Sequence, residues 1–493
     1  MNKQLRFLSR TVFGMFIVLF LSVTMIQFVA ADELRAHELN GRTLKNSYEI
    51  ERGSILADGD PVAYSTPTDD EFRFVRQYAD GETYAAVTGY YSRTQGMTGL
   101  EAAMNQELSG LSNAQFFTRI ARTLTGEQPQ GSSIETTIEP AVQQAAMEAM
   151  AGFEGAVVAL DPSTGRILAL VSTPSFDPNL LSSNSDAEII ANYHRLDAEE
   201  SQPLVNRAVA GDLYHPGSTY KLVVAAAAIE NGSATPESTF DNPASLALPQ
   251  SSAVMQNASR TTCGDGAEVS LQRALVYSCN IPMAELAMSM DRDVVPKMAR
   301  EFGFEQDLSI PLPVTPSVTS TPIDAAQAAI SAIGHLDVRA TPLQVAMVSA
   351  GVADGGAGSG AQRGRHVIAP DLRVEQQFDP EVFSTPISES TASQLAAMME
   401  HVVGDADGTG HMAAIDGVRV AGKTGTAETG LDESGAERPY TLWFTGFAPV
   451  DDPKVAIAVV IANGGGEAYG YVGSTYDLPT AVGKRVMEAV LNQ

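Results

Sequence analysis

The chain has 493 residues, with 31 basic against 59 acidic side chains and a formal net charge of −28. This acidity excludes nucleic-acid binders, which need basic side chains against phosphate. Hydrophobic residues make up 44% and charged residues 18%, a globular composition that excludes a disordered chain or a coiled coil. The two cysteines, Cys263 and Cys279, form no CxxC pair, which excludes a tetrahedral thiolate metal site.

A membrane-anchor pattern comes first. Residues 1–10 contain Lys3, Arg6 and Arg10 without an acidic residue, and residues 11–30 are mostly apolar. Such a run can cross about 30 Å of hydrocarbon as a helix, and the basic flank favours a cytoplasmic N-terminus. We expect a cytoplasmic tail at 1–10, a single-pass transmembrane anchor at 11–30 and an extracytoplasmic remainder at the cell membrane. A cleaved signal peptide is the alternative.

Residues 31–132 mix short apolar stretches with turn residues and carry no motif with assignable chemistry. The sequence then predicts a helix at 139–150, with Pro140 near its first turn, as helix starts prefer. Two apolar strands at 155–160 and 166–171, around a Pro/Gly turn, predict a β-hairpin.

The rest of the chain is first helical and then strand-like. Helical patterns lie at 218–230, 270–277, 324–333 and 341–353. Three successive antiparallel strands are predicted at 418–426, 441–448 and 455–462. Strands at both ends with helices between them indicate an α+β domain, in which helices pack on one antiparallel sheet.

The sharpest chemical signal is the segment His215-Pro-Gly-Ser218-Thr-Tyr-Lys221, which opens an apolar helical run. One helical turn separates Ser218 from Lys221, so the amine can reach the hydroxyl. Burial, a helix N-terminus and a second cation all lower the pKa of a lysine. A neutral Lys221 can then take the proton from Ser218 as it attacks a carbonyl. The alternative is a capping serine with a lysine that reaches solvent.

Two further segments carry polar groups. Ser278-Cys-Asn280 lies between two helical patterns, one that starts at Ser270 and one that starts at Ile281. This position places a hydroxyl and an amide on an interhelical loop. Lys423-Thr-Gly-Thr lies on a predicted strand, where Gly425 permits close approach of a substrate to the backbone. Residues 417–424 also fit the P-loop pattern, but a strand-like stretch replaces the Gly-rich turn and no helix follows, so we reject nucleotide binding.

The order Ser-x-x-Lys, Ser-x-Asn, Lys-Thr-Gly resembles the signature of penicillin-binding proteins and class A β-lactamases. The chain is most similar to the class B, monofunctional penicillin-binding proteins, in particular the penicillin-binding protein A group of actinobacteria. Further segments that carry the resemblance are Arg52-Gly-Ser-Ile55, Gly99-Leu-Glu101 and Trp443-Phe-Thr-Gly-Phe-Ala448. One departure is Gly334-His335, where the family pattern has Gly-Gln.

This resemblance implies an α+β penicillin-binding transpeptidase domain of the serine β-lactamase-like type at 133–493. A small pedestal domain, of the dimerisation type, is implied at 31–132. These residues are too few for a second enzyme, so no glycosyltransferase domain is expected.

The resemblance also implies peptidoglycan D,D-transpeptidase activity on stem peptides that end in D-Ala-D-Ala. Ser218 is the implied nucleophile and Lys221 the base. Ser278, bonded to Lys221, relays a proton to the leaving amine, and Asn280 holds Lys221 and a substrate amide.

The same resemblance gives Lys423 a cationic role. With Thr424 and Thr426 it attracts the terminal carboxylate of the substrate, beside Gly425. The backbone N–H groups of Ser218 and Thr426 form the implied oxyanion hole. β-Lactams are trapped as the same serine ester.

The expected partners are stem peptides, β-lactams, the membrane and proteins of division or elongation, and no nucleic acid. Neither a cofactor nor a metal is expected, since the histidines show no metal-ligand spacing. Cys263 and Cys279 can form a disulfide in an exported domain and so tether the Ser-x-Asn loop, or remain two buried thiols. A D,D-carboxypeptidase or β-lactamase, and a non-catalytic division scaffold, are the alternative functions.

Overall fold

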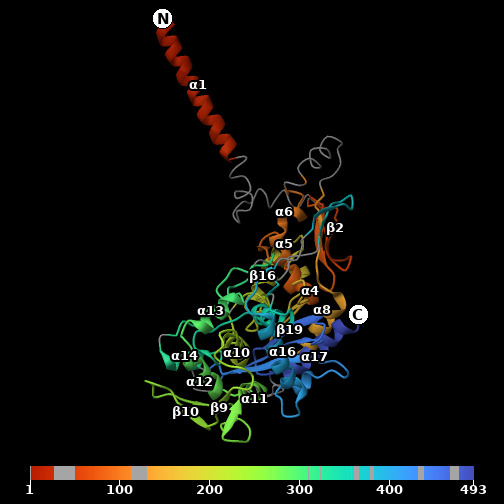
Figure 1. The fold of residues 1–493 in the computed structure, drawn as a ribbon. Coiled ribbons are helices and arrows are strands. Elements are labelled where there is room, and N and C mark those ends of the chain that lie inside the picture. The colour runs from red at the N-terminus through yellow and green to blue at the C-terminus, as the bar shows by residue number, and fades with distance from the viewer. Residues whose placement is uncertain are drawn as a thin grey trace.

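The structure is a computed structural model that describes residues 2–26, 50–70, 72–112, 115, 130–211, 213–308, 310–322, 324–356, 358–359, 366–377, 382–430, 438–466 and 477–493. Helix α1 (Asn2–Thr24) stands apart from the other elements in Figure 1. Its stretch Arg6–Thr24 has a mean hydropathy of 1.9 and is long and apolar enough to cross a membrane. The helix begins before the predicted anchor at 11–30, whose residues 27–30 lie outside the described residues.

A five-stranded antiparallel sheet forms the centre of the larger domain. In order across the sheet, its strands are β17 (Ala421–Ala427), β18 (Thr441–Ala448), β19 (Val455–Ile461), β7 (Gly155–Leu160) and β8 (Ile167–Thr173). The predicted hairpin and the three C-terminal strands are therefore neighbours. Residues 418–420, predicted as strand, lie outside it because β17 begins at Ala421.

Helices cover both faces of this sheet (Figure 1). The described helices of this domain are α8 (Pro140–Ala149), α9 (Asp186–Asp197), α10 (Lys221–Glu230), α11 (Leu271–Val276), α12 (Ile281–Ser289), α13 (Val294–Glu301), α14 (Ala325–Ser331), α15 (Pro342–Ala353), α16 (Glu389–Gly404) and α17 (Asp477–Leu491). Of these, α8, α15, α16 and α17 make the main contacts with the strands of the sheet. Short 3₁₀ helices are η3 (Pro178–Leu181), η4 (Gly217–Tyr220) and η5 (His411–Ala413). The predicted helices near 139, 270, 324 and 341 correspond to α8, α11, α14 and α15, so the α+β prediction is confirmed.

Burial on both faces explains why the central strands are uninterrupted apolar runs. Val157 and Val459 lie in one buried cluster with Val142 of α8 and Val486 of α17. Val158, on the opposite face of β7, belongs to a second cluster. A strand that alternates its side chains between two such clusters gains from an apolar residue at every position.

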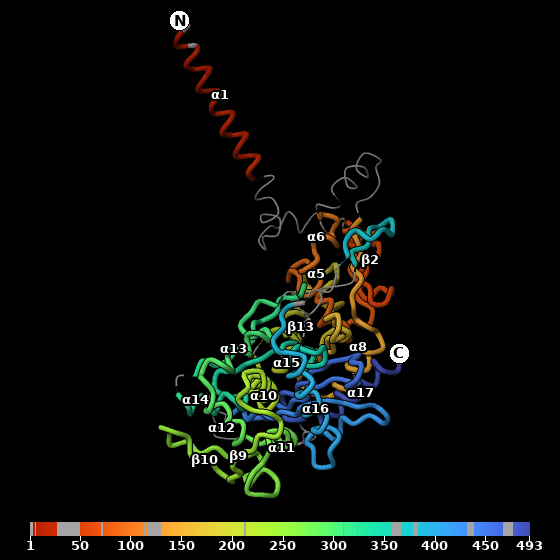
Figure 2. Tube along the Cα trace, viewed as in Figure 1, coloured from red at the N-terminus to blue at the C-terminus, as the bar shows by residue number. Residues whose placement is uncertain are grey.

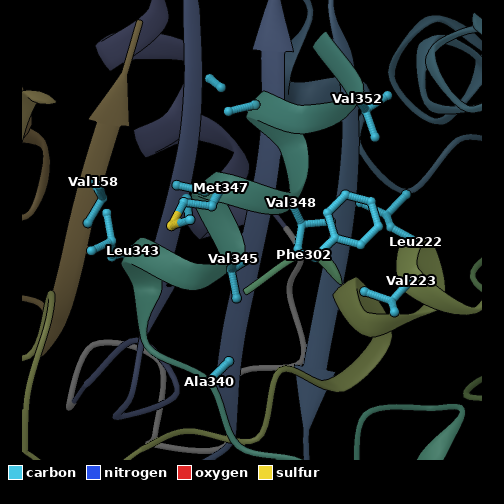
Figure 3. Close-up of a cluster of buried hydrophobic side chains, with 14 of the residues drawn as sticks. Val158, Leu222, Val223, Phe302, Ala340, Leu343, Val345, Met347, Val348 and Val352 are labelled. Carbon is cyan, nitrogen blue, oxygen red and sulfur yellow. The ribbon is translucent and has the colours of Figure 1, made fainter. Parts of the chain in front are cut away.

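Helix α15 fills the second cluster and connects the sheet to helix α10. Figure 3 shows Leu343 of α15 toward Val158 of β7, and Val348 of α15 beside Phe302, which in turn contacts Leu222 of α10. All five side chains are buried. This packing holds α10, whose first residue is the predicted base, in the interior.

A second sheet builds the pedestal. In order, its strands are β15 (Val374–Gln377), β14 (His366–Ile368), β6 (Ser133–Glu135), β1 (Ile55–Ala57), β2 (Asp60–Pro67) and β3 (Phe74–Tyr78). Figure 2 shows the β14–β15 hairpin, in cyan, against the orange pedestal segments. The strands of this sheet come from residues on both sides of position 132. The sheet therefore crosses the domain boundary that the sequence predicts there.

Shorter elements complete the described part of the chain. The pedestal also contains α4 (Gly81–Thr88), α5 (Gly99–Ala103), α6 (Asn105–Leu108), β4 (Tyr91–Ser92) and β5 (Gly96–Met97). Two-stranded pairs join β9 (Thr239–Asp241) to β12 (Glu268–Ser270), β10 (Ser245–Ala247) to β11 (Val254–Gln256), and β13 (Gly358–Ser359) to β16 (Val382–Ser384).

A buried ion cluster fixes the pedestal. Glu101 has no exposed surface, and its carboxylate accepts hydrogen bonds from Arg52 Nε at 2.5 Å and Arg76 Nε at 2.6 Å. Burial acts to raise the pKa of Glu101, but the charges of Arg76 and Arg52 outweigh it and hold that pKa below its ordinary value. Two of the segments that carried the family resemblance thus meet in one ion cluster.

Replacing Glu101 with Gln should destabilise the pedestal strongly, because it leaves two buried guanidinium groups without a carboxylate. We expect a loss of about 3–5 kcal/mol in the free energy of unfolding, measured by urea denaturation. Glu148→Gln is the matched control, since Glu148 pairs with Arg485 on the surface and exposed pairs contribute about 0–1 kcal/mol. Equal losses in the two variants would contradict the role of the cluster.

Candidate active site

The predicted nucleophile lies on η4, which packs against strand β17. Gly217 has a φ of +53°, and a Cβ there would lie 2.6 Å from the Thr426 carbonyl oxygen. Glycine is therefore required both by conformation and by space. Ser218 follows it and is half-buried. The predicted helix at 218–230 begins as this 3₁₀ turn and becomes α-helical at Lys221.

Lys221 has no exposed surface. Its Nζ donates to the Ser278 carbonyl oxygen at 2.7 Å and to Asn280 Oδ1 at 2.8 Å. Burial, followed by the charge of Lys423, lowers the pKa of Lys221 well below its ordinary value. A neutral amine has two N–H groups and one lone pair, so these two acceptors leave the lone pair of Lys221 available to accept a proton.

The Ser-x-Asn loop joins α11 to α12 through a C-terminal helix cap. The Cys279 N–H donates to the Ala274 carbonyl at 2.8 Å and the Ser278 N–H to the Leu275 carbonyl at 3.1 Å. This pair of bonds is the Schellman arrangement, whose left-handed position usually holds glycine. Here Ser278 occupies it with a φ of +58°, a conformation that costs an L-residue roughly 1–2 kcal/mol. The strained residue is the one that carries the functional hydroxyl.

Neighbouring segments hold this loop in place. Asn257 Oδ1 accepts from the backbone N–H groups of Asn280, at 2.9 Å, and Ile281, at 3.2 Å. Cys263 and Cys279 form a disulfide with Cα atoms 5.8 Å apart, which closes the alternative of two free thiols that the sequence left open. Asn257 was missed by the sequence analysis because a single asparagine on a short strand-to-turn segment carries no motif.

The structure differs from the prediction for Ser278 in its lysine partner and from the prediction for Lys423 in its charge. Lys423 Nζ donates to Ser278 Oγ at 2.8 Å and to the Thr424 carbonyl at 2.8 Å, so the Ser278 hydroxyl bonds Lys423, whereas Lys221 bonds the Ser278 backbone. Lys423 has no exposed surface, and burial lowers its pKa to about 7. It was expected to stay cationic, whereas a group with this pKa is partly neutral at pH 7.

The two threonines of β17 have different environments. Thr424 is fully buried, and its hydroxyl donates to Thr409 Oγ1 at 2.7 Å. The Thr409 N–H in turn donates to the Val276 carbonyl at the end of α11, which ties the strand to the Ser-x-Asn loop. Thr426 Oγ1 is buried, and no protein partner lies within the described part of the chain. Of the two hydroxyls, only that of Thr426 is left for a ligand.

Gly425 serves packing more than substrate approach. A Cβ at this position would lie 2.9 Å from the Pro216 carbonyl oxygen and 3.0 Å from Thr219 Cγ2. The space next to Gly425 is therefore filled by the nucleophile turn, contrary to the sequence interpretation that it admits a substrate. The absence of a side chain lets η4 lie directly on β17.

Among the described residues, no group of three or more His, Cys, Asp or Glu side chains could hold a metal ion. The site instead gathers one serine on η4, two buried lysines and a strained loop serine. A serine nucleophile one helical turn from a buried amine, with a second buried lysine beside the loop serine, is an arrangement suited to acyl transfer.

Family models match both domains. The penicillin binding protein transpeptidase domain matches residues 155–488, and the penicillin binding protein A dimerisation domain matches residues 52–134. The peptidoglycan D,D-transpeptidase PbpA of Mycolicibacterium smegmatis is 39% identical over 499 residues, which cover 100% of both chains. The chain belongs to the class B penicillin-binding proteins.

More distant class B relatives and solved structures agree with this membership. The peptidoglycan D,D-transpeptidase MrdA of Haemophilus influenzae is 30% identical over 478 residues, which cover 85% of this chain and 70% of MrdA. The structure of penicillin-binding protein A from Mycobacterium tuberculosis as a ceftriaxone acyl-enzyme complex matches with a TM-score of 0.85 and 37% identity, over 91% of this chain and 100% of that one. The fold of this class B penicillin-binding protein is thus that of a known transpeptidase.

Cys263→Ser should loosen the Ser-x-Asn loop of this class B penicillin-binding protein. A crosslink that closes a loop of this size stabilises by roughly 3 kcal/mol in the loop-entropy account. We expect a lower melting temperature and slower acylation by penicillin. Reductant should cause the same losses in wild type and none in the variant. Unchanged melting temperature and acylation rate in Cys263→Ser would contradict the tether.

The two lysines should give acylation a bell-shaped pH profile. Lys221 must be neutral to accept a proton, so acylation falls as the pH drops through its lowered pKa. Lys423 must be cationic to attract a carboxylate, so acylation also falls as the pH rises past its pKa of about 7. The measurement is the second-order rate constant for penicillin. Penicillin methyl ester, which lacks the carboxylate, should lose the alkaline decline; an identical decline with the ester would contradict the role of Lys423.

Proposed function

We propose that this protein is a serine-type peptidoglycan D,D-transpeptidase that crosslinks stem peptides through an acyl-Ser218 intermediate. The observation that carries the proposal is the Lys221 amine, which is buried, depressed in pKa and left with a free lone pair next to the nucleophile turn. A lysine whose pKa is lowered in this way, with its lone pair available, can act as a general base.

In the first half-reaction, Ser218 attacks the penultimate carbonyl of a stem peptide while Lys221 takes the hydroxyl proton. The bond to the terminal D-alanine breaks, and its nitrogen receives the proton. Ser278, whose hydroxyl is held by Lys423 at 2.8 Å, relays that proton to the leaving amine. Asn280 holds Lys221 at 2.8 Å and offers its amide to the substrate.

Strand β17 provides the substrate-binding edge. It is an edge strand of its sheet, and among the described residues no strand pairs with its outer edge. An extended peptide can bind along such an edge. Lys423 attracts the terminal carboxylate, which in turn favours the charged form of a lysine whose pKa is about 7. Thr424 supports this role through Thr409, and Thr426 offers its free hydroxyl.

The backbone N–H groups of Ser218 and Thr426 form the oxyanion hole of this mechanism. Each such donor is typically worth about 3 kcal/mol in the transition state. In the second half-reaction, the amine of another stem peptide attacks the acyl carbon, and the Ser218 oxygen recovers its proton through Lys221. β-Lactams acylate Ser218 in the same way and remain as stable esters.

The apolar helix at Arg6–Thr24 supports a single-pass anchor that holds the catalytic domain outside the cytoplasm. We further propose that residues 31–132 act as a pedestal, that residues 133–493 form the transpeptidase domain, and that proteins of division or elongation bind this enzyme. A D,D-carboxypeptidase would use the same residues with water as the acceptor.

Incubation with a fluorescent penicillin tests the acyl-serine mechanism. We expect covalent label on wild type and none on Ser218→Ala, because only a serine oxygen at that position forms the ester. Ser182→Ala serves as the control. Ser182 begins a second Ser-x-Asn sequence, Ser182-Ser-Asn184, and its hydroxyl bonds only backbone carbonyls. An unlabelled wild type would reject the mechanism. Labelled wild type that yields only hydrolysed peptide would favour the carboxypeptidase.

A further inference from the structure

The segment after α14 lies against the nucleophile turn. Gly334 has a φ of +73°, and a Cβ added to it would collide with the Gly217 carbonyl oxygen. The Gly217 N–H donates to the Gly334 carbonyl at 3.3 Å. Because Gly217 directly precedes Ser218, these main-chain contacts hold His335, the residue after Gly334, at the edge of the active site. His335 is also the position at which the chain departs from its family pattern.

The ring of His335 has a defined orientation and tautomer. Its Nδ1 lies 3.0 Å from the Ile333 carbonyl oxygen, and its ring stacks on that of His215 with centroids 5.4 Å apart. A carbonyl only accepts, so Nδ1 carries the hydrogen and Nε2 of the neutral ring keeps its lone pair. Within the described residues, Nε2 has no protein partner. The His335 side chain is half-buried.

Burial and two nearby cations favour the neutral form of His335, and one carboxylate, that of Glu428, acts on it in the opposite direction. Burial is the largest effect and lowers the pKa of His335; the charges of Lys221 and Arg339 add to it, and the Glu428 carboxylate opposes it. Burial, Arg339 and His335 also lower the pKa of the stacked His215 to about 4. Glu428 is exposed and lies two residues after Thr426, just past the end of β17.

We propose that His335 and Glu428 form the subsite for the acceptor amine of the second stem peptide. Glu428 attracts a primary ammonium group to this side of the acyl-enzyme, and the Nε2 lone pair of His335 accepts a hydrogen bond from its N–H. The bound ammonium first releases one proton to solvent. The resulting neutral amine nitrogen forms the bond to the acyl carbon, the ester bond to Ser218 breaks, and the second proton shed by this nitrogen passes through Lys221 to the Ser218 oxygen. Water, being uncharged, gains nothing from Glu428.

This subsite rests on the proposed function, since the amine needs an acyl-Ser218 to attack. It predicts how the acyl-enzyme divides between crosslinking and hydrolysis, while leaving its formation unchanged. The experiment supplies a donor peptide ending in D-Ala-D-Ala and a diamino-acid peptide as the acceptor. The ratio of crosslinked to hydrolysed product is measured, and fluorescent penicillin reports the acylation rate of each variant.

His335→Leu removes the acceptor atom, so we expect the crosslinked-to-hydrolysed ratio to fall about tenfold, the equivalent of one good hydrogen bond. Glu428→Gln should lower it less, and mainly at low acceptor concentration. His335→Gln should retain most of the ratio, because its amide oxygen also accepts. His194→Leu, at an exposed position on α9, is the matched control and should leave the ratio unchanged.

A His335→Leu enzyme that is labelled like wild type and keeps the wild-type ratio would overturn the subsite. If that variant fails to fold, Glu428→Gln decides: a lower ratio supports the subsite and an unchanged ratio overturns it. Failure of the proposed function has a different signature. It appears in wild type itself, as absence of penicillin label or as hydrolysed product alone at every acceptor concentration.

Discussion

Two lysine side chains without exposed surface converge on one short loop, and the chemistry of the site depends on their burial. Lys221 bonds the backbone and Asn280, Lys423 bonds the Ser278 hydroxyl, and neither lysine forms an ion pair within the described residues. A buried ammonium without a carboxylate is costly, so the protein lowers the pKa of both amines instead. Exclusion of water, more than any one contact, thus creates the base.

The packing around α10 is therefore part of the catalytic apparatus. Helix α15 fills the space between α10 and the sheet, and its Leu343 and Val348 are buried. Such a dense core keeps water from the Lys221 amine. The polar side of the same site is fixed by the disulfide at Cys279, by Asn257 and by the helix cap at Ser278. Apolar packing sets the pKa, and these polar contacts set the geometry.

The sequence predicted the features that depend on local pattern. The apolar strands, the capped helices and the three motifs in order were enough for the α+β fold and the family. The details that depend on tertiary contact were not accessible. The sequence does not indicate which lysine the Ser278 hydroxyl bonds. It also does not indicate whether a substrate or the nucleophile turn lies beside Gly425. Asn257 and Thr409 stand outside any motif because their partners are distant in sequence.

The pedestal sheet has a consequence for how the chain is made. Its strands β14 and β15 come from residues 366–377, whereas β1 to β3 precede residue 79. During synthesis, the N-terminal strands emerge long before the hairpin that extends their sheet, and contacts so far apart in sequence form slowly. Until residue 377 has emerged, β6 presents an unpaired edge that other chains could join. The two domains must therefore mature together, because the pedestal sheet is complete only after residues 366–377, which follow most of the catalytic domain in the chain, have been made.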